Sequence, residues 1–570
     1  MLSEEMIRNI RKYAIKNAMD YGRAKPENVI GKVMSSVKTQ SWPELRPEVD
    51  KIVNEVNSLS KANLESEYEK YRDEFREKYE KTVEATSKPR MELDGAVVGN
   101  FATRFAPEPS GYLHIGHASA AFLAQEFSKI YKGKVFLYFD DTNPEKETQE
   151  FVDACKSDLD WMGIKFDKEY YASDNMQMMY DCARKLISAD KAYACECSAD
   201  EIKKNRFVGK ECIHRNAKAE ENLGKFEMML SGKYDEEKIV IRLKADMESQ
   251  NTAIRDPTIL RIKKKKHYKQ GTKYVVWPTY DFNTPINDSV NGITDAIRTK
   301  EYNLRGPLYD MVLDYLGMRK PRVHLHARIK IKGQPRQKRE IRKLIEDKNI
   351  TGYDDPRLVT ISALRRRGVQ PEAIKEFVLD FGMSNADSVV DISPLFTHNR
   401  RIIDNTAKRL YYVPGPVDVE LNSDEKFTVK MKLNPSADAG IREYDIAGKI
   451  YISGEDASGL KDNDVINLKD LFSLEIKKGE DSLIGTIVEK KGDKRLQWVS
   501  EGNFIKGSIL VPGDLVDEEG NFIKGSLRTN EGYIESYASN LKERDIVLLE
   551  RFGFCILDNR KSMQFIFISK

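Results

Sequence analysis

The sequence predicts a multidomain protein in which a parallel α/β domain lies between helical segments and C-terminal antiparallel β-barrels. Three observations lead to this prediction. The length of 570 residues is too great for one hydrophobic core and corresponds to roughly four domains. Between residues 99 and 316, short apolar strands alternate with helical stretches, which is typical of a parallel sheet covered by helices. After residue 393, short strands follow one another between Gly, Asp and Asn turns, which is typical of barrels.

The composition excludes several classes of protein. Hydrophobic residues make up 40% of the chain and charged residues 32%, which indicates a globular protein rather than a disordered or collagen-like one. The formal net charge of +3 is too small to attract nucleic acid to the whole chain, so an RNA site would have to be local. The chain has no apolar signal core and no apolar run long enough to cross a bilayer. Its six cysteines are unevenly spaced, which does not indicate a disulfide framework. We therefore expect a cytoplasmic protein with no membrane partner.

Residues 1–95 are expected to form a helical N-terminal extension. Apolar residues recur at helical spacing from Met6 to Met19, and the stretch from Val49 to Lys81 has the composition of a highly charged helix. The extension holds 18 basic and 18 acidic residues, so it has no net charge with which to bind RNA. We therefore expect it to contact a protein partner or to pack against the rest of the chain. A stretch rich in Ser, Pro and Gly marks its end.

The most informative stretch is RFAPEPSGYLHIGH at residues 104–117. We expect a strand to end at its start, Pro107 to stiffen the following loop, and Gly111 to turn the chain into a helix. A turn from a strand into a helix presents backbone N–H groups and the positive end of the helix dipole, and both bind phosphate. This stretch is therefore a candidate nucleotide site.

His114 and His117 lie three residues apart, on one face of the first turn of that helix. From there both can donate hydrogen bonds to a phosphoryl group that gains charge in a displacement reaction. Gly116 removes a side chain where a nucleotide ring has to pack against the backbone. The alternative is a pair of histidines that caps a helix, but the Pro-x-Pro-x-Gly loop in front of them favours the nucleotide site.

This stretch resembles the HIGH signature of class I aminoacyl-tRNA synthetases, in the form found in the glutamyl and glutaminyl branch. The resemblance covers roughly residues 96–570, and further motifs follow in the family's order. The all-β C-terminal region is similar to that of the archaeal and eukaryotic glutamyl-tRNA synthetases and of the glutaminyl enzymes. The further motifs are FDDTNPEKE at Phe139, VWPTYDF at Val276, GITDAIRTKEY at Gly292, DDPRL at Asp354, ALRRRG at Ala363 and ERFGFCILD at Glu550.

The resemblance implies a Rossmann-like class I catalytic domain at residues 96–339, with an insertion at about 192–272 that binds the acceptor end of tRNA. It also implies a helical subdomain at 340–395 and an anticodon-binding β-barrel region at 396–570. The implied reaction has two steps. Glutamate attacks the α-phosphate of ATP, which is used with Mg2+, and the 3′ end of tRNA(Glu) then takes the glutamyl group from the adenylate. Whether tRNA(Gln) is a second RNA substrate stays open.

By the same resemblance, PRQKR at residues 335–339 corresponds to the mobile KMSKS loop of the family. Lys338 matches the second lysine of that signature, whereas Gln337 replaces the usual serine. Lys338, His114 and His117 would then form the catalytic set. Taken alone, the segment could equally be a solvated basic turn. The expected ATP-binding residues are Pro107, Gly111, His114, Gly116, His117 and Lys338.

Four residues are expected to bind glutamate. Arg104, Asp140 and Tyr280 match positions that contact the amino acid in the family, Asp140 and Tyr280 through its α-amino group. Arg298 is expected to select glutamate, because glutamyl enzymes carry Arg there and a planar guanidinium can bind a carboxylate bidentately. Glutaminyl enzymes carry a small or neutral residue at that position. The alternative for Arg298 is a surface ion pair with Glu301.

Cys195, Cys197, Cys212 and His214 are a candidate metal site. Three thiols and one imidazole within a 20-residue segment are a plausible tetrahedral set for zinc. The set is similar to a zinc knuckle found in the acceptor-binding insertion of some glutamyl enzymes. Unliganded thiols are the alternative, because Cys-x-Cys is a less stereotyped spacing than Cys-x-x-Cys.

Two other functions are compatible with much of this sequence. A glutaminyl enzyme shares the architecture and is opposed mainly by Arg298, and a catalytically silent tRNA-binding paralogue is suggested by Gln337. Tyr138 stands where most relatives have Arg, which leaves details of the pocket open.

The octapeptide EGNFIKGS occurs at Glu501 and again at Glu519. Because repeat arrays need three or more units, we expect two similar hairpin edges of one barrel.

Overall fold

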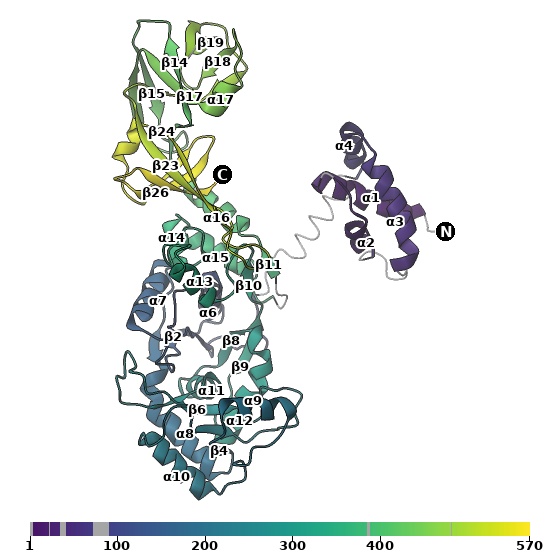
Figure 1. The fold of residues 1–570 in the computed structure, drawn as a ribbon, viewed down its shortest axis with the longest axis vertical. Coiled ribbons are helices and arrows are strands. Elements are labelled where there is room, and N and C mark those ends of the chain that lie inside the picture. The colour runs from purple at the N-terminus through teal and green to yellow at the C-terminus, as the bar shows by residue number, and fades with distance from the viewer. Residues whose placement is uncertain (1–3, 22, 35–41, 72–90, 385–387, 480–481) are drawn as a thin grey trace. The chain divides into compact units, whose positions relative to one another are not determined.

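The structure is a computed structural model that describes residues 4–570 except 22, 35–41, 72–90, 385–387 and 480–481. The chain divides into two compact units, Met1–Pro89 and Arg90–Lys570 (Figure 1). The Ser, Pro and Gly-rich stretch expected to end the N-terminal extension, residues 86–99, lies partly outside the described residues. Within the described residues, no helix has both the length and the apolar character needed to cross a membrane.

The first unit is a bundle of helices with its own core. Ile10, Val29 and Val49 come from different helices and are fully buried against one another. The helix expected from residue 49 onward is interrupted, because Ser60 caps a new helix by accepting a hydrogen bond from the backbone N–H of Asn63 at 3.3 Å. Residues 72–81 of that expected helix lie outside the described residues. The helices are α1 (Glu4–Tyr21), α2 (Pro26–Met34), α3 (Trp42–Asn57) and α4 (Lys61–Glu69).

The second unit contains the predicted parallel α/β domain. Strands β1, β2 and β3 form one parallel sheet, and β8 pairs in parallel with β9. The two parts join beside β1, where the backbone N–H of Thr294 donates to the carbonyl of Ala102 at 2.9 Å. The strand order β3-β2-β1-β8-β9 therefore changes direction between β1 and β8, which is where parallel sheets bind ligands. These strands are β1 (Ala102–Phe105), β2 (Lys134–Phe139), β3 (Lys168–Tyr171), β8 (Asp295–Thr299) and β9 (Arg322–His326).

Helices connect the parallel strands, as the alternating sequence pattern predicts. The helix α6 follows β1, α7 follows β2, and α12 lies between β8 and β9. The buried face of α6 includes Ala118, Ala121 and Phe122, which pack in one core with Leu137 and Phe139 of β2. These helices are α6 (Ile115–Ile130), α7 (Gln149–Trp161) and α12 (Gly306–Leu316), and the short 3₁₀ helices η1 (Ala172–Asn175) and η2 (Lys300–Arg305) follow β3 and β8.

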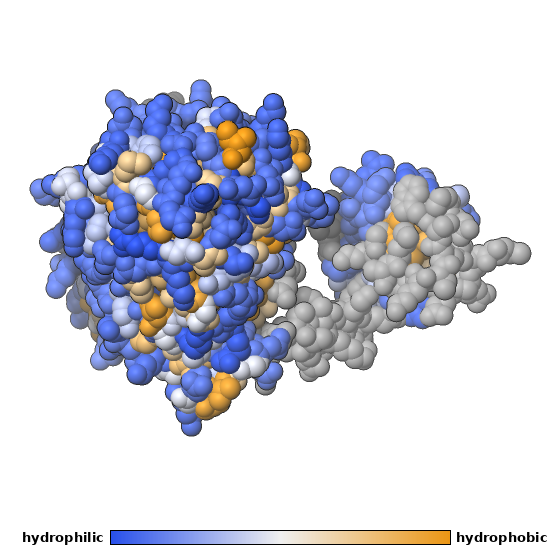
Figure 2. Space-filling model, turned by 90° about the horizontal axis from the view of Figure 1, so that it is seen from below, coloured by the Kyte–Doolittle hydropathy of each residue, from blue (hydrophilic) through white to orange (hydrophobic). Residues whose placement is uncertain are grey.

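An antiparallel sheet in the order β4-β5-β6-β7 occupies the segment in which the insertion was expected. It has a separate core, to which Phe226 of α10 and Met179 of α8 contribute. Large apolar side chains are exposed in this segment, among them Phe207 (80%) and Ile213 (88%). Figure 2 shows one face of the molecule, whose surface is mostly hydrophilic with small hydrophobic patches. The elements are α8 (Met176–Ser188), β4 (Ala192–Cys195), α9 (Ala199–Val208), α10 (Ala219–Leu230), β5 (Val240–Leu243), β6 (Thr258–Ile262), β7 (Val276–Pro278) and α11 (Tyr280–Val290).

A helical segment follows the parallel sheet, and its strands β10 and β11 pair in parallel. Helix α16 extends past the expected boundary at residue 395, because Leu395, Phe396 and Ile403 belong to the same core as α6 and α15. The elements are β10 (Ile329–Ile331), α13 (Lys338–Glu346), α14 (Ile361–Arg366), α15 (Pro371–Leu379), β11 (Ser388–Val390) and α16 (Ser393–Ile403).

The C-terminal region is built of β-strands, as predicted. In its described part, the orders β12-β25-β26-β27-β23-β24-β13 and β21-β18-β19-β20-β14-β17-β22 define two large sheets, and β15 pairs with β16. Most neighbours are antiparallel, and pairs such as β23 with β27 are parallel. The short helix α17 (Gly454–Ser458) and the 3₁₀ helix η3 (Ser536–Asn540) interrupt the strands. The strands are β12 (Lys408–Leu410), β13 (Tyr412–Pro414), β14 (Pro416–Leu421), β15 (Phe427–Lys432), β16 (Ile441–Ile446), β17 (Lys449–Ser453), β18 (Val465–Leu468), β19 (Ser473–Lys478), β20 (Leu483–Val488), β21 (Lys494–Leu496), β22 (Val499–Ser500), β23 (Phe504–Pro512), β24 (Leu527–Glu535), β25 (Ile546–Leu549), β26 (Gly553–Asn559) and β27 (Gln564–Ser569).

The two copies of EGNFIKGS have different structures. In the first copy, Phe504 begins strand β23 and pairs with Glu535 of β24. The second copy lies in the loop between β23 and β24, where Phe522 makes only an isolated bridge with Val516. The expectation of two similar hairpin edges is therefore wrong. Contacts made elsewhere in the fold decide the conformation of this sequence, which has no single strong local preference.

Candidate active site

The two histidines of the HIGH-like stretch form the first turn of α6. His114 is the N-cap residue, and its Nδ1 accepts the backbone N–H of Gly116 at 3.1 Å. The Nδ1 of His117 accepts the backbone N–H of His114 at 3.2 Å, and the two rings lie 3.9 Å apart. A neutral imidazole has one N–H, so these accepting Nδ1 atoms place the proton of each ring on Nε2. The pair therefore caps the helix, and each ring keeps an Nε2–H group that the cap does not use.

Both histidines are neutral at neutral pH. Burial, with the positive charges of Lys338 and Arg328, lowers the pKa of His114 to about 4. Burial also holds the pKa of His117 well below its usual value, and His114 adds to the effect. Each neutral ring can donate a hydrogen bond but carries no positive charge.

Gly116 leaves room for the ring of His114, which the sequence did not reveal. A Cβ at this position would lie 2.9 Å from Cε1 of His114, which is closer than real Cβ contacts allow. The ring of His114 thus occupies the space that a side chain would need. Any larger residue would displace the His114 imidazole from its capping position.

Lys338 lies in the same site, although it is far from the histidines in sequence. It is the first residue of α13, and its Nζ donates to the hydroxyl of Ser110 at 3.2 Å. A Cβ built on Gly111 would lie 3.5 Å from Cδ of Lys338. Burial lowers the pKa of Lys338, whereas the carboxylate of Glu108 acts in the opposite direction. The segment from residue 332 to Lys338 itself is called the lysine loop below.

Gln337 and Pro107 have backbone roles in the site. The N–H groups of Arg336 and Gln337 both donate to Oε2 of Glu340, at 2.7 and 3.3 Å, and this caps the start of α13. The replacement of serine by Gln337 therefore leaves an ordered helix start. The carbonyl of Pro107 accepts the N–H of Asp140 at 3.1 Å, which ties the HIGH-like loop to the end of β2.

Asp140 is a buried carboxylate at the end of β2. Its Oδ1 accepts a hydrogen bond from Nδ2 of Asn283 at 2.7 Å. Burial raises the pKa of Asp140 well above its usual range, and Glu147, Glu108 and Asp141 raise it further. A carboxylate in this environment is stabilised by a cationic ligand such as an ammonium group.

Asn283 is a site residue that the sequence interpretation missed. Its Oδ1 accepts from the hydroxyl of Tyr138 at 3.2 Å while its Nδ2 holds Asp140. Tyr138, which departs from the family pattern, thus supports Asp140 through Asn283. The available signal was helical spacing, because Asn283 lies three residues after Tyr280 on the same face of α11.

Arg298 is buried among tyrosine rings. Its Cζ lies 5.4, 4.7 and 5.2 Å from the ring centres of Tyr280, Tyr302 and Tyr309, and its Nη2 donates to the hydroxyl of Tyr280 at 2.9 Å. Its Nε and Nη1 are buried without a hydrogen-bond partner among the described residues. The alternative of a surface ion pair with Glu301 is excluded, since only 5% of Arg298 is exposed and Glu301 accepts from Thr299 at 3.0 Å. Two open donors on a buried cation suit an anionic ligand.

Arg104 has a different environment from Arg298. Its Nε and Nη2 donate to both oxygens of Asp288 at 2.8 and 3.0 Å, and its Nη1 donates to the carbonyl of Ile297 at 3.1 Å. The charge of Arg104 is therefore already neutralised within the protein. Asp288 was also missed from the sequence, although it lies on the same helix as Tyr280. The structure brings Arg104, Asp140, Tyr280 and Arg298 to the end of the sheet at β1, β2 and β8.

The four predicted metal ligands come together. The ligand atoms of Cys195, Cys197, Cys212 and His214 all lie within 4.8 Å of one another. Cys212 Sγ is 3.5 Å from Cys195 Sγ, 3.3 Å from Cys197 Sγ and 3.3 Å from His214 Nδ1. Tetrahedral zinc with Zn–S bonds of about 2.3 Å places its sulfurs about 3.8 Å apart, so this donor set fits the ion.

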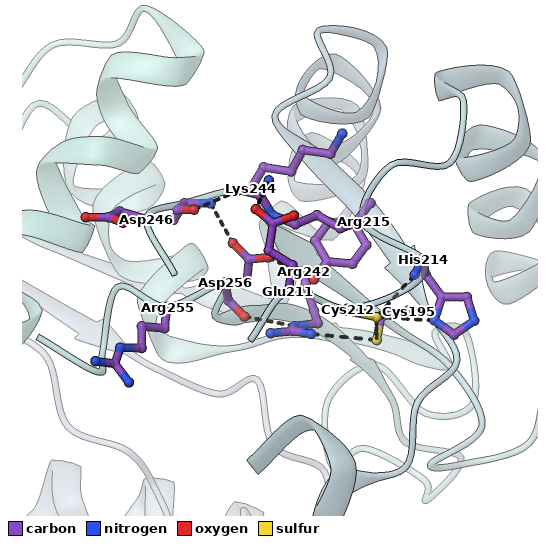
Figure 3. A network of polar contacts seen from close by, with 12 residues as sticks. Cys195, Glu211, Cys212, His214, Arg215, Arg242, Lys244, Asp246, Arg255 and Asp256 are labelled. Atoms are coloured by element: carbon purple, nitrogen blue, oxygen red, sulfur yellow. Dashed lines mark hydrogen bonds and ion pairs between the residues drawn. The ribbon is translucent and has the colours of Figure 1, made fainter. Parts of the chain in front are cut away.

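A buried polar network supports the cysteine cluster (Figure 3). Asp256 accepts from Nε of Arg215 at 2.9 Å and from the N–H of Ala245 at 2.7 Å, and its carbonyl accepts from Nε of Arg242 at 2.9 Å. Arg242 is fully buried, and its Nη1 lies 3.8 Å from Cys195 Sγ. A guanidinium beside the sulfur stabilises the thiolate form that a metal ligand needs. Sequence patterns did not identify this network.

The fold and the site define a class I nucleotide-dependent synthetase. Residues 100–403 match the family described as tRNA synthetases class I (E and Q), catalytic domain, and residues 407–494 match the anticodon-binding domain of the same family. The chain therefore belongs to the class I tRNA synthetases of the glutamate and glutamine (E and Q) type.

Archaeal relatives resemble the chain over nearly its whole length. The glutamate–tRNA ligase of Nitrosopumilus maritimus is 37% identical over 571 residues, which cover 99% of this chain and 100% of the relative. The glutamate–tRNA ligase of Pyrococcus furiosus is 37% identical over 568 residues, 96% of each chain. A crystal structure of a glutamate tRNA ligase from Elizabethkingia meningosepticum, in complex with its amino acid, is 20% identical with a TM-score of 0.40, covering 53% of this chain and 70% of that one.

Proposed function

We propose that the protein is a glutamate–tRNA ligase, which activates glutamate with ATP and transfers the glutamyl group to the 3′ end of tRNA(Glu). The observation that carries the choice of amino acid is the buried guanidinium of Arg298, with two donors that lack a partner among the described residues. A side-chain carboxylate would complete this environment, because a buried unpaired charge is costly. A neutral amide would leave the charge of Arg298 uncompensated.

The amino acid would be oriented between two charged groups. Its ammonium group would lie against Asp140, which Asn283 holds in place, and against the hydroxyl of Tyr280. Its side-chain carboxylate would reach Arg298. Arg104 would contact the substrate from β1 with N–H groups not used by Asp288, and would hold β1 and β8 at a fixed spacing.

The first reaction step is an attack of the α-carboxylate of glutamate on the α-phosphate of ATP. Negative charge grows on the phosphate oxygens, and the Nε2–H groups of His114 and His117 and the ammonium of Lys338 would donate to them. Pro107 and Gly111 would shape the loop that holds the nucleotide, and Gly116 would let it approach the first turn of α6. ATP would bring Mg2+ on its phosphate oxygens, and the ion would neutralise the leaving pyrophosphate.

For the cysteine cluster, we propose bound zinc as a structural ion. Cys195, Cys197, Cys212 and His214 would hold it, which would cross-link β4 to the segment after α9. Nε2 of His214 lies 3.9 Å from Oε2 of Glu196, which is beyond hydrogen-bond distance, and Oε2 of Glu196 accepts from Nζ of Lys225 at 2.8 Å. The ion would stabilise the insertion that receives the acceptor end of tRNA.

Three further assignments stay predictions. Charging of tRNA(Gln) with glutamate is one, because it depends on bases read by the C-terminal sheets. A protein partner for the N-terminal unit is another, and its helices have the separate core that a docking module requires. The cytoplasm is the expected location.

Aminoacylation with separate transcripts of tRNA(Glu) and tRNA(Gln), each with glutamate and with glutamine, tests the proposed function. We expect glutamate to be attached to tRNA(Glu) and glutamine to neither RNA. Attachment of glutamine to tRNA(Gln) alone would support the glutaminyl alternative. A lack of adenylate formation with either amino acid would support a silent paralogue.

A further inference from the structure

The loop between β23 and β24, residues 513–526, contacts the lysine loop and is called the barrel loop here. The N–H groups of Leu515 and Val516 both donate to the carbonyl of Gly333, at 3.0 and 3.2 Å. Nη2 of Arg336 donates to the carbonyl of Glu518 at 2.8 Å. The lysine loop is thus hydrogen-bonded to a segment about 180 residues away, at both its start and its end.

The barrel loop also packs against the helix that begins at Lys338. Leu515 and Val516 are buried in one cluster with Leu344 of α13, and Phe522 packs against the same cluster. The cluster includes Leu358, which lies in the segment after α13. The hydrophobic contacts therefore hold the body of α13, while the hydrogen bonds hold the loop in front of it.

Gly333 shows how closely the two loops approach. Its φ is +72°, in the region that favours glycine, and a Cβ there would lie 2.4 Å from Oδ1 and 2.8 Å from Cβ of Asp514. Because the Cβ of Asp514 is itself too near, a rotation of its carboxylate would not relieve the overlap. Residue 333 has to be glycine because a side chain there would overlap Asp514 of the barrel loop.

We propose that the barrel loop is a positioning element for adenylate formation, which holds α13 and the lysine loop where Lys338 reaches the nucleotide site. This inference rests on the proposed function, because it concerns the step in which Lys338 acts. The Nζ of Lys338 lies 3.2 Å from the hydroxyl of Ser110, so a shift of α13 would withdraw it from the site. A misplacement of about 1 Å in a reacting group can lower a rate by about a hundredfold. The C-terminal β region then contributes to the first reaction step as well as to RNA binding.

The repeated octapeptide provides a matched pair of variants. Phe522→Ala removes a ring that packs beside α13, whereas Phe504→Ala removes the same residue of the other copy, which stacks on Tyr533 at 3.9 Å. With saturating glutamate and tRNA, we expect Phe522→Ala to lower the single-turnover rate of adenylate formation about tenfold or more, and to leave KM for glutamate unchanged. Phe504→Ala should stay within about twofold of the unaltered protein.

A double variant separates positioning from a general loss of structure. If the barrel loop acts through Lys338, Phe522→Ala should have no further effect on the rate of a Lys338→Ala protein. Additive effects of the two changes would overturn the proposal. Equal rates for Phe522→Ala and Phe504→Ala would also overturn it.

A second pair covers the case in which Phe522→Ala does not fold. Gly333→Ala meets Asp514, whereas Gly502→Ala has a similar φ of +77° and no atom within 4 Å of its Cβ. The strain of a positive φ is common to both, so a slower adenylate step in Gly333→Ala alone supports the proposal. Equal rates in the two variants would overturn it. If the unaltered protein forms no adenylate, the proposed function fails instead.

Discussion

Arg104 and Arg298 lie on the neighbouring strands β1 and β8 and are both buried, but only Arg104 has a carboxylate partner among the described residues. Asp288 binds Arg104 through both oxygens and also accepts from Tyr309, whose ring lies 5.2 Å from Cζ of Arg298. The charge of Arg104 is thus neutralised within the protein, while Arg298 has two N–H donors without a partner among the described residues. Arg298 therefore keeps both its charge and two donors for a ligand, whereas Arg104 can offer a substrate only the N–H groups of a charge that Asp288 already neutralises.

The first prediction concerns stability. Arg104→Gln should lower the midpoint of thermal unfolding, because it leaves the buried Asp288 without its cation at a cost of about 3–5 kcal/mol. Arg298→Gln should leave the midpoint unchanged or raise it, since it removes a buried charge that has no counter-ion. The comparison uses the ligand-free protein. A large loss of stability in Arg298→Gln would show that this guanidinium has a structural partner.

The second prediction concerns the choice of amino acid. Arg298→Cys should reduce kcat/KM for glutamate roughly a thousandfold, because a desolvated side-chain carboxylate would lose its cation. Glutamine is neutral and should be affected much less, so the ratio of kcat/KM for the two amino acids should change. KM for ATP is the internal control. An unchanged ratio would place the selection of glutamate at another residue.

The third prediction concerns the phosphate-binding cation. Lys338→Ala should raise the barrier to adenylate formation by about 1–3 kcal/mol, the worth of a charge-assisted hydrogen bond. Lys343→Ala removes a lysine from the exposed face of the same helix and should leave the rate unchanged. Single-turnover rates measure both. Equal rates in the two variants would show that the changed loop sequence has lost its role.

The fourth prediction concerns the cysteine cluster. Elemental analysis should find about one zinc per chain, and Cys212→Ser should lose the metal while ATP binding survives. Cys182→Ser provides the control, because this buried cysteine lies outside the cluster and its variant should keep the metal. Aminoacylation should fall only in Cys212→Ser. Protein purified without chelators that contains no zinc would contradict the assignment.

The fifth prediction concerns pH. The pKa of His114 is about 4 in the folded protein, below the ordinary value of 6.5. As pH falls from 6.5 towards 4, the unfolded chain binds a proton that the folded protein does not, so stability is lost across this window. The shift corresponds to a contribution on the order of 3 kcal/mol.

The variant His114→Asn tests this dependence. Asn keeps an oxygen that can accept the N–H of Gly116 but does not titrate, so the variant should lose less stability than the unaltered protein between neutral pH and pH 4. Urea unfolding at several pH values measures the difference. The same pH dependence in both proteins would show that His114 is accessible to protons in the folded state.

Local sequence rules were sufficient for the parts of the protein whose interactions are near in the chain. The strand, turn and helix around His114 and His117 follow from a 14-residue stretch, because a helix start is capped by residues within its own first turn. The four metal-site ligands lie within 20 residues, so their spacing alone was enough to propose the cluster. The alternation of strands and helices likewise predicted the parallel sheet.

Tertiary structure decided the features that depend on distant partners. Arg104 and Asp288 are 184 positions apart, and nothing local to Arg298 shows that it would be buried without a carboxylate. The two copies of EGNFIKGS make the same point most directly, since one forms a strand and the other a loop beside the lysine loop. Identical local preferences can have different outcomes because burial and hydrogen bonding depend on which surfaces the rest of the fold presents.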